Sequence, residues 1–507
     1  MILNSDETRN HKTFLFVLAI TYLIRIVFTS SVGLIDDEAY HWSWTQDLMM
    51  SYFDHPGLIA WLEKLSTGLL GDTLWGVRLP SFLCYTLALY FFYRLAVDLF
   101  NHQVARVATL LFLWSPFYGF GGYVASPEAP FILFWVMGSW VFWQGVRPDG
   151  LRWSTKKTWI CLGLIMGLGL NSKFIMALLA PAMGLYLLST SHRKVLLTRW
   201  PWIGVLIATV ICLPIFIWNH EFSWPGFYYQ FYDRHTGRSF SIERWLVWLS
   251  AQLVFYTPII FGLFILTLRH SWNSWKQAKH RFLFCMALPS VLIFYPQPLW
   301  ADYKPHWPGA AHLFLLIGAS AIYLESQKFK KWLLIGILAF YIPLNLITYT
   351  PFLGPWMPHV YHFLGFEKPW NSKWDLSNEF YGWKELGKKV NEMQKNHHRD
   401  FGVKPFIGAH RYETTAQTYW GTGQKTVMLS PVKSHYTVVQ KKRQSLLGYR
   451  GLPTLIVTTE KYPAVPETYG KWDSCTSEEF KTYRGSYVSR TFTIWTCLNF
   501  QGLHREL

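Results

Sequence analysis

The chain has 507 residues, of which 51% are hydrophobic, 19% are aromatic and only 15% are charged, and its formal net charge is +17. Soluble domains carry about 25% charged residues, so this composition and the recurring long apolar runs exclude an ordinary soluble protein. The positive charge does not indicate nucleic-acid binding, because membrane proteins concentrate Lys and Arg in their cytoplasmic loops.

The apolar runs end near Tyr349 and predict a polytopic α-helical membrane protein with about eleven spans. The predicted spans are Thr13–Leu34, Leu79–Phe100, Val104–Gly122, Ala129–Val146, Thr158–Leu170, Phe174–Ser189, Trp202–Trp218, Trp245–Leu268, Phe282–Pro298, Gly309–Tyr323 and Trp332–Tyr349. Alternate loops are either rich in Lys and Arg or acidic, which places the N-terminus and the basic loops in the cytoplasm. The first run lacks a small-residue cleavage site, so we interpret it as an uncleaved first helix.

The C-terminal region differs in pattern from the rest of the chain. The predicted organisation is a membrane domain at 1–350 that contains a first outward loop at 35–78, a linker at 351–370, and an outward-facing α/β extramembrane domain at 371–507. WKELGKKVNEM has the pattern of an amphipathic helix, and KPFIGAH, TLIVTT and RTFTIWTCL have the pattern of short strands. We expect Cys475 and Cys497 to form a disulfide, because thiols outside the cytoplasm are usually oxidised.

Three consecutive acids, Asp36, Asp37 and Glu38, follow the first apolar run directly. Trp and Tyr residues come next at helical spacing, which predicts an amphipathic helix that lies along the membrane surface. Such a helix would hold the acids at the level of the lipid headgroups. The alternative is a solvated loop that merely ends a helix. Adjacent like charges raise one another's pKa and cost energy, which argues against that alternative.

Two further charged residues lie at outward helix ends. Glu128, in SPEAP, opens the fourth predicted span, although Ser-Pro-Glu is also an ordinary helix start. The segment Thr158–Ser189 has basic flanks on both sides but is too short for two full crossings, which predicts two short helices that meet at Asn171-Ser172-Lys173. Lys173 would then need an anionic partner, either a protein carboxylate or a lipid phosphate.

More cations lie on the same outward side. They are Arg234, His235 and Arg238 between two spans, and Lys304 and His306 just before the tenth span. Each could simply fix a loop, but together they outline a basic, aromatic-lined pocket. Arg binds phosphate bidentately and Lys binds it as a point charge. Because the sequence has no Gly-rich nucleotide loop, we expect the anion to be a lipid phosphate.

Six segments, in this order, resemble the bacterial relatives of protein O-mannosyltransferases and of the lipid A aminoarabinose transferases. They are DEAYHWSW, YFDHPGLIAWL, GVRLPS, SPEAP, LNSKF and YKPHWPGAA. The resemblance covers residues 12–325 and, more loosely, the C-terminal region. It implies the GT-C fold and glycosyl transfer from a polyprenyl-phosphate carrier by a single inverting displacement.

The resemblance also assigns roles. It implies that Asp37 is the catalytic base with Glu38 beside it, and that Lys173 contacts the donor phosphate together with Arg234 or Arg238. Further candidates are Glu128 as a second acid, Lys304 and His306 in the phosphate pocket, and Tyr40, His41, Asp54 and His55 in the first-loop pocket. The chain departs from the pattern at Gly57, where a second Pro is usual, at Glu128, where Asp is common, and at His41, where Tyr is common.

We therefore expect an integral-membrane glycosyltransferase at the outer face of a bacterial inner membrane. Its donor would be a polyprenyl-phosphate-linked hexose or pentose, and its acceptor a hydroxyl or phosphate on lipid A, a protein or another glycan. The alternatives are a transporter or flippase for a lipid-linked or anionic solute and an assembly subunit with an inactive site. The sequence indicates no certain cofactor, and it leaves open whether a divalent metal is needed.

Overall fold

The computed structural model describes residues 5–122, 124–150, 152–234, 236, 238–326, 331, 335–350, 353–366, 370–443 and 446–504. The chain forms two compact units, each of which is built from separate stretches of sequence. The first unit comprises Met1–Ile26, Met50–Leu62 and Arg78–Thr348, and the second comprises Val27–Met49, Glu63–Val77 and Tyr349–Leu507. Two pieces of the predicted first outward loop therefore fold with the C-terminal region.

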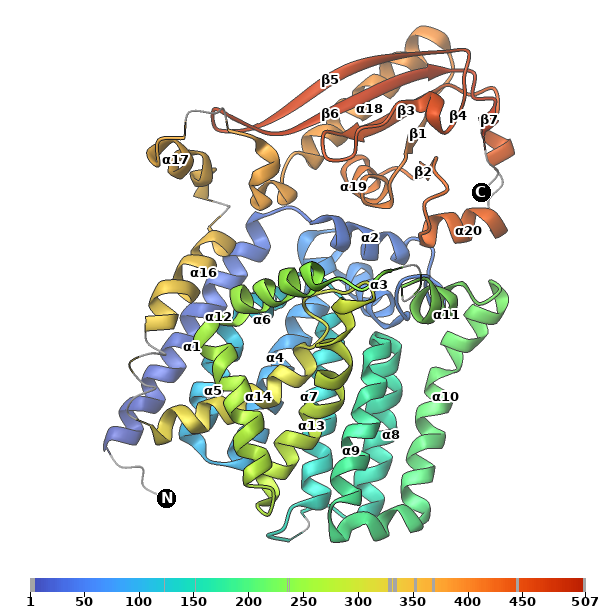
Figure 1. Cartoon of the computed structure of the whole chain (residues 1–507). Coiled ribbons are helices and arrows are strands. Elements are labelled where there is room, and N and C mark those ends of the chain that lie inside the picture. Colours follow the sequence, from blue (N-terminus) through green and yellow to red (C-terminus); the bar gives the residue numbers. More distant parts are fainter. Residues whose placement is uncertain are drawn as a thin grey trace. The chain divides into compact units, whose positions relative to one another are not determined.

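The first unit is a helical bundle (Figure 1). Its helices, with α1 and α4 continuing into the segments of the second unit, are α1 (Ser5–Ser31), α4 (Leu74–Leu99), α5 (His102–Trp114), α6 (Pro116–Gly121), α7 (Glu128–Val146), α8 (Thr155–Ser172), α9 (Leu179–Leu188), α10 (Arg199–Glu221), α11 (Pro225–Tyr228), α12 (Ile242–Asn273), α13 (Ala278–Phe294), α14 (Gly309–Glu325) and α16 (Ile342–Tyr349). Each predicted span falls on helical residues, which confirms the polytopic α-helical fold. The last one is described only from Ile335, because residues 332–334 lie outside the described part of the chain.

Helix length and composition, applied to the described residues, identify six of the eleven predicted spans. Within the described residues, six helices are long and apolar enough to cross a membrane: Arg9–Ser31, Leu74–Leu99, Glu128–Val146, Arg199–Glu221, Ile242–Asn273 and Ala278–Leu299. The predicted spans at 104–122, 158–170, 174–189 and 309–323 fall on shorter or less apolar helices, and the span at 332–349 lies partly outside the described residues. The third predicted span, for example, is divided into two helices. Helix α5 ends at Trp114 and α6 begins at Pro116, because the Ser115 hydroxyl caps α6 by accepting a hydrogen bond from the Tyr118 amide.

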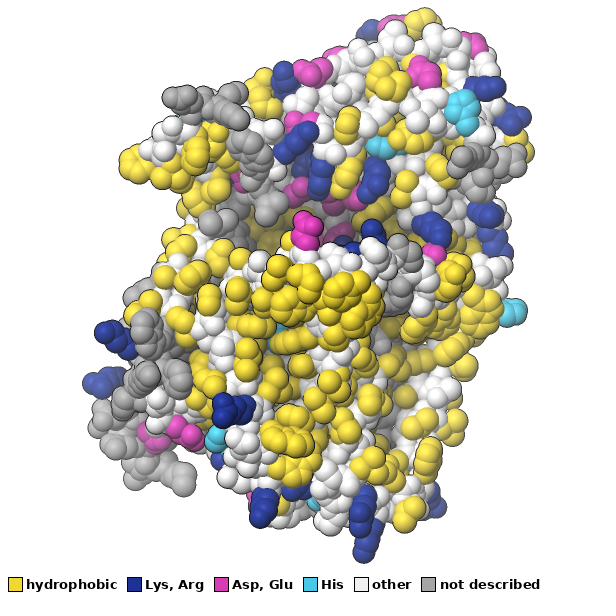
Figure 2. Space-filling view, viewed as in Figure 1, with side chains coloured by type: hydrophobic (Ala, Val, Ile, Leu, Met, Phe, Trp, Pro, Cys, Tyr) yellow, Lys and Arg dark blue, Asp and Glu magenta, His cyan; other side chains and the backbone are white. Residues whose placement is uncertain are grey.

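Much of the visible surface of the helical unit is hydrophobic (Figure 2). Large apolar side chains such as Leu206, Val247 and Leu292 are more than half exposed there. A soluble protein seldom leaves so much apolar surface open, whereas lipid acyl chains cover such a surface without cost.

The second unit contains a five-stranded sheet in the order β2-β1-β3-β6-β5 (Figure 1). Its strands are β1 (Phe406–Ala409), β2 (Thr426–Met428), β3 (Thr454–Thr459), β5 (Ser474–Arg484) and β6 (Tyr487–Leu498), and a separate pair is formed by β4 (Gly470–Lys471) and β7 (Gly502–Leu503). Strand β1 pairs in parallel with β2 and β3, whereas β6 pairs antiparallel with β3 and β5. The predicted α/β character of this region is confirmed.

Helices cover this sheet. The helices of the second unit are α2 (Asp36–Thr45), α3 (Leu58–Leu70, which begins in the first unit), α17 (Trp356–Phe363), α18 (Trp383–Phe401), α19 (Tyr412–Thr422) and α20 (His435–Arg443). Trp383 and Leu386 of α18 pack with Val457 of β3 and Phe492 of β6 in one buried cluster. Cys475 and Cys497, which stand opposite each other on β5 and β6, form a disulfide.

The prediction that α2 is an amphipathic surface helix is wrong. Every residue from Glu38 to Thr45 is buried, so α2 has no broad polar face. Its aromatic side chains pack on α19 of the same unit: the Trp42 ring lies 5.1 Å from Tyr419 and 4.8 Å from Trp420. The aromatic residues at helical spacing correctly indicated a buried face. The pattern could not show that this face packs against protein and not against lipid.

Candidate functional site

The three consecutive acids form the first turn of α2, and each has a different environment. At a helix N-terminus, free backbone N–H groups and the helix dipole favour negative charge. The Asp36 Oδ1 atom accepts a hydrogen bond of 3.2 Å from Gln417 Nε2, and Glu38 Oε2 accepts one of 3.0 Å from the Ile35 amide. Asp37, between them, is exposed. Of the three carboxylates, Asp37 is therefore the most accessible.

Asp36 lies in a network of charged side chains. Its Oδ2 atom is 3.7 Å from Lys461 Nζ, and Lys461 lies 2.8 Å from Glu379. Burial, and then the Glu379 charge, raise the pKa of Asp36 to about 7, although Arg490 and Lys461 oppose the shift. For Glu379, burial acts in the same direction, but Arg490 and Lys461 outweigh it and hold the pKa below its usual value.

A fourth acid, Glu63 of α3, was missed in the sequence. Its side chain is fully buried, and burial together with the nearby Glu38 raises its pKa well above the usual value. Glu63 therefore favours the protonated form beside Glu38. The available signal in the sequence was the position of this single acid directly after the apolar stretch LIAWL.

The aromatic residues predicted for the first-loop pocket are buried inside the second unit. The Tyr40 hydroxyl accepts a hydrogen bond of 2.8 Å from the His435 amide, and its ring lies 4.7 Å from Tyr412. The His41 ring packs at 4.8 Å on the edge of Trp44. These contacts fix α2 against α19 and α20.

A cationic pocket lies in the first unit. Lys173 has an extended backbone between α8 and the 3₁₀ turn at Phe174–Leu178, which confirms the predicted helix break. Its side chain is 7% exposed and forms an ion pair with Glu128. His306 Nε2 lies 3.2 Å from the same Oε1 atom of Glu128. Three residues from distant predicted segments thus meet, and a protein carboxylate is the partner of Lys173 in this structure.

The surroundings of this pocket are aromatic and electropositive. Phe117 stacks on His306 at 6.1 Å with an interplanar angle of 9°. Burial, and then the Lys173 ammonium, lower the pKa of the His306 imidazole despite its contact with Glu128. The positive charge of Lys304 acts in the same direction, and His55 interacts electrostatically with Glu128.

The structure distinguishes the two candidate arginines. The Arg234 guanidinium lies over the rings of Tyr229 (4.6 Å) and Trp307 (5.5 Å), and Trp307 also lines the pocket around Lys173. Arg238, in contrast, is 53% exposed and forms an ion pair of 2.9 Å with Asp302. His235 lies outside the described residues. Arg234 is therefore the arginine that lies beside the pocket.

Asp54 connects the first loop to this arginine through its backbone. Its carbonyl oxygen accepts a hydrogen bond of 2.6 Å from Gln230 Nε2, and Gln230 Oε1 accepts one of 3.0 Å from Arg234. In the described part of the chain, no group of three or more His, Cys, Asp or Glu side chains is arranged to hold a metal ion.

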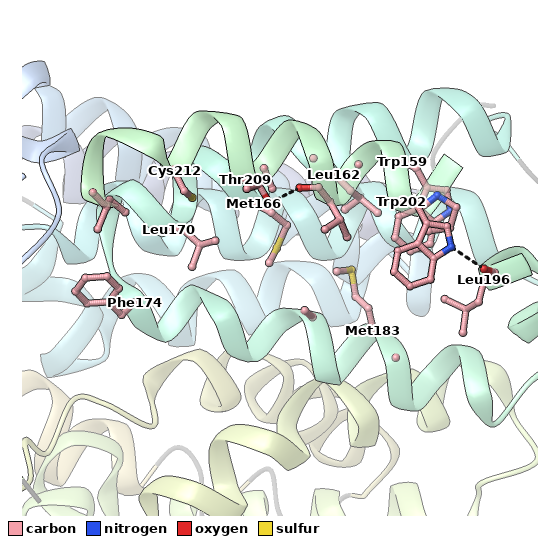
Figure 3. Close-up of a pocket in the computed structure, with 18 of the residues that line it drawn as sticks. Trp159, Leu162, Met166, Leu170, Phe174, Met183, Leu196, Trp202, Thr209 and Cys212 are labelled. Atoms are coloured by element: carbon pink, nitrogen blue, oxygen red, sulfur yellow. Dashed lines mark hydrogen bonds between the residues drawn. The ribbon is translucent and has the colours of Figure 1, made fainter. Parts of the chain in front are cut away.

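An apolar groove of about 470 Å³ runs between α8, α9 and α10 (Figure 3). Phe174 lies at one end of the groove, and Trp159 and Trp202 lie at the other. Its lining is almost entirely hydrophobic and includes Gly163 and Gly204, whose missing side chains let α8 and α10 approach closely. Because Phe174 directly follows Lys173, the groove ends next to the cationic pocket.

The sequence is similar to those of known membrane-lipid-dependent glycosyltransferases. Residues 54–218 match the family described as dolichyl-phosphate-mannose-protein mannosyltransferase. The chain is 25% identical over 331 residues to an undecaprenyl phosphate-α-4-amino-4-deoxy-L-arabinose arabinosyl transferase of Pectobacterium carotovorum, covering 62% of this chain and 58% of the relative. It is 23% identical over 307 residues to the lipid A galacturonosyltransferase RgtD of Rhizobium johnstonii, covering 59% and 62%. The chain thus spans about three fifths of the length of these curated relatives.

The similarity to solved structures extends over nearly the whole chain. ArnT from Cupriavidus metallidurans bound to undecaprenyl phosphate superposes with a TM-score of 0.65 at 14% identity, covering 95% of this chain and 97% of that one. The archaeal oligosaccharyltransferase AglB from Archaeoglobus fulgidus gives a TM-score of 0.51 at 10% identity, covering 89% and 70%. The fold is therefore the GT-C fold of membrane glycosyltransferases. In sequence, the chain is similar to an aminoarabinose transferase, in line with the resemblance of the six sequence segments.

Proposed function

We propose that this protein is an integral-membrane glycosyltransferase that moves a sugar from a polyprenyl-phosphate carrier to an acceptor outside the cytoplasm. The observation that carries the proposal is the helix break at Lys173, which puts a buried ammonium group beside the end of an apolar groove. A polyprenyl phosphate has the matching chemistry, because its anionic head is joined directly to a long isoprenoid chain. The structural neighbour ArnT, which was solved with undecaprenyl phosphate, supports this class of donor.

The cations would stabilise the leaving group. As the bond between the sugar and the phosphate oxygen breaks, negative charge builds up on the phosphate, and preorganised cations lower the energy of that state. Lys173 provides a point charge, and Arg234 provides a planar guanidinium beside the same pocket. The incoming phosphate would take over Lys173 from Glu128, which holds it in this structure.

Asp37 would act as the base. The acceptor oxygen forms a bond to the anomeric carbon while the carbon–oxygen bond to the phosphate breaks, and the hydroxyl proton of the acceptor passes to the carboxylate. Asp37 is suited to this role because it is exposed, whereas Asp36 and Glu38 are held by neighbouring groups. A single displacement of this kind inverts the anomeric configuration.

Lipid A is the acceptor we favour, since one of the relatives is named as a lipid A galacturonosyltransferase. The names of the relatives also suggest an aminopentose or a uronic acid as the sugar. We place the reaction at the outer face of a bacterial inner membrane, with the second unit outside the cytoplasm. The disulfide between Cys475 and Cys497 supports this orientation, because disulfides persist in oxidising compartments.

A transporter or flippase for a lipid-linked solute is the competing function. An apolar groove beside a cationic pocket would suit it as well, but an exposed carboxylate at a helix N-terminus has no evident part in lipid transport. The two functions differ in their products, since only a transferase releases free polyprenyl phosphate in proportion to glycosylated acceptor.

The test is to incubate the purified protein in nanodiscs with lipid A and a polyprenyl-phosphate sugar fraction from the host cells, and to analyse both lipids by mass spectrometry. We expect lipid A to gain the mass of one sugar and an equal amount of carrier to be released. Asp37→Asn protein serves as the inactive comparison, because it should keep donor binding but lose transfer. Absence of any sugar transfer, with lipid translocation in proteoliposomes instead, would establish the transporter.

A further inference from the structure

The first turn of α2 is held by a residue from the far end of the sequence. Gln417, in the middle of α19, donates two hydrogen bonds through its amide nitrogen: 2.8 Å to the Leu34 carbonyl and 3.2 Å to Asp36 Oδ1. One contact precedes α2 and the other is on its first residue. Gln417 therefore fixes the direction in which the chain enters the helix, and its fully buried position leaves it little freedom to move.

A chain of alternating charges supports the same turn. Lys461, just after β3, lies between Asp36 (3.7 Å) and Glu379 (2.8 Å). The other oxygen of Glu379 lies 3.3 Å from Arg490 of β6, and Arg490 also donates a hydrogen bond of 3.0 Å to the Asn378 carbonyl. Two acidic and two basic side chains thus alternate, and Glu379 gives the buried Arg490 the partner without which its charge would be costly.

These contacts act on Asp37 through the backbone. Asp36 and Asp37 are consecutive residues of one helical turn, so a rotation or shift of the Asp36 peptide moves the Asp37 carboxylate with it. A misplacement of about 1 Å in a reacting group can reduce a rate by about 10²-fold. Gln417 itself is fully buried and cannot serve as a substrate ligand in this structure.

We propose that Gln417 and Lys461 are positioning residues that hold the acidic first turn of α2 so that Asp37 can act as the base. This inference rests on the proposed glycosyl transfer. It gives the C-terminal region a direct part in the reaction: the sheet and α19 set the geometry of a base that lies more than three hundred residues earlier in the chain.

The test compares Gln417→Ala and Lys461→Met with wild type in steady-state transfer assays. We expect kcat to fall by about 10–10²-fold with little change in the KM for the polyprenyl-phosphate donor, because the proposed phosphate ligands are untouched. Lys461→Arg keeps the charge and should restore most of the rate.

Lys481→Met is the matched control. Lys481 is 44% exposed and pairs with Glu479 at 2.8 Å, as Lys461 is 42% exposed and pairs with Glu379 at 2.8 Å, but Lys481 has no contact with α2 residues among its described ion pairs. Its substitution should leave kcat unchanged.

A double-mutant cycle separates positioning from general destabilisation. In the Asp37→Asn background, Gln417→Ala and Lys461→Met should cause no further loss of turnover, because the base they position is already absent. The inference is wrong if wild type is active and both Gln417→Ala and Lys461→Met keep its full kcat. It is also wrong if the loss of kcat in each variant adds fully to the loss caused by Asp37→Asn. If Gln417→Ala does not fold, the Lys461→Met and Lys461→Arg pair decides the question. A wild-type protein without transfer activity would instead overturn the proposed function.

Discussion

Lys173 and Glu128 form an ion pair between the C-terminal end of α8 and the first residue of α7. The same Glu128 oxygen lies 3.2 Å from His306, so one carboxylate atom is shared by two nitrogen groups. The pair gives the buried lysine an anionic partner, since an uncompensated ammonium group would be costly. It also implies competition, because a donor phosphate and Glu128 are both anions that bind Lys173.

Substitutions in this pair should change donor binding in opposite directions. Lys173→Ala removes the cation and should weaken binding of undecaprenyl phosphate by about 10-fold or more, as expected for the loss of one charge-assisted contact. Glu128→Gln removes the competing charge and should tighten it. Titration of tryptophan fluorescence with undecaprenyl phosphate in detergent measures both. Equal affinity of wild type and Lys173→Ala would show that Lys173 is only a structural cation.

The two arginines, four residues apart, should behave differently. Arg234→Ala should weaken donor binding and lower kcat/KM by about 10-fold, because its guanidinium lies beside the phosphate pocket. Arg238→Ala should change kcat/KM less than twofold, since exposed ion pairs such as Arg238–Asp302 contribute little. The same transfer assay measures both variants. A larger loss for Arg238→Ala would assign the phosphate contact to the other arginine.

The neighbouring acids Asp36 and Asp37 provide the sharpest test of the base. Asp37→Asn keeps the size of the side chain but cannot accept a proton, so transfer should fall by about 10²–10⁴-fold with donor binding retained. Asp36→Asn should be milder and cost no more than Lys461→Met, because it loses the ion pair with Lys461 but its new amide oxygen still accepts the hydrogen bond from Gln417. Similar activity of the two Asn variants, measured with the same donor and acceptor, would remove Asp37 as the base.

The raised pKa of Asp36 makes a specific prediction about stability. Because this pKa is about 7 in the folded protein and near 4 in the unfolded chain, the folded state binds the proton more tightly between these values. Protonated Asp36 therefore adds to the free energy of unfolding at low pH, and this contribution is lost as the pH rises through about 7.

Thermal unfolding of the purified protein at pH 5 and pH 8 tests this prediction. The melting temperature of wild type should fall more from pH 5 to pH 8 than that of Asp36→Asn, whose side chain does not titrate. Glu63 also has a raised pKa, but it is present in both proteins, so the difference between them isolates Asp36. Identical pH dependence of the two proteins would contradict the raised pKa.

Features encoded in a short stretch of sequence were predictable. The break at Lys173 followed from the length of the segment between two basic flanks, and the strands around KPFIGAH, TLIVTT and RTFTIWTCL followed from their patterns. Strand β5 was missed, because SCTSEEFKTYR is mostly polar and exposed and so has no clear apolar alternation.

Features that depend on distant partners were not predictable. A sequence could show that Lys173 needs an anion, but only the structure shows Glu128 in that position. Arg234 and Arg238 lie only four residues apart in the sequence, so their assignment depended on the contact of Arg234 with Trp307. The burial of α2 and the contacts of Gln417 and Lys461 involve residues several hundred positions apart, for which local periodicity carries no information.

The discontinuous second unit has a consequence for biosynthesis. Its first pieces, Val27–Met49 and Glu63–Val77, leave the ribosome long before Tyr349–Leu507, which supplies the sheet, α19 and α20. The helical unit can therefore insert into the membrane while the segment with Asp37 still waits for its folding partner. Under the proposed function, a nascent chain that has completed its apolar helices is still inactive, and activity begins only when α19 and the strands of the sheet have been synthesised and have folded with the segment that carries Asp37.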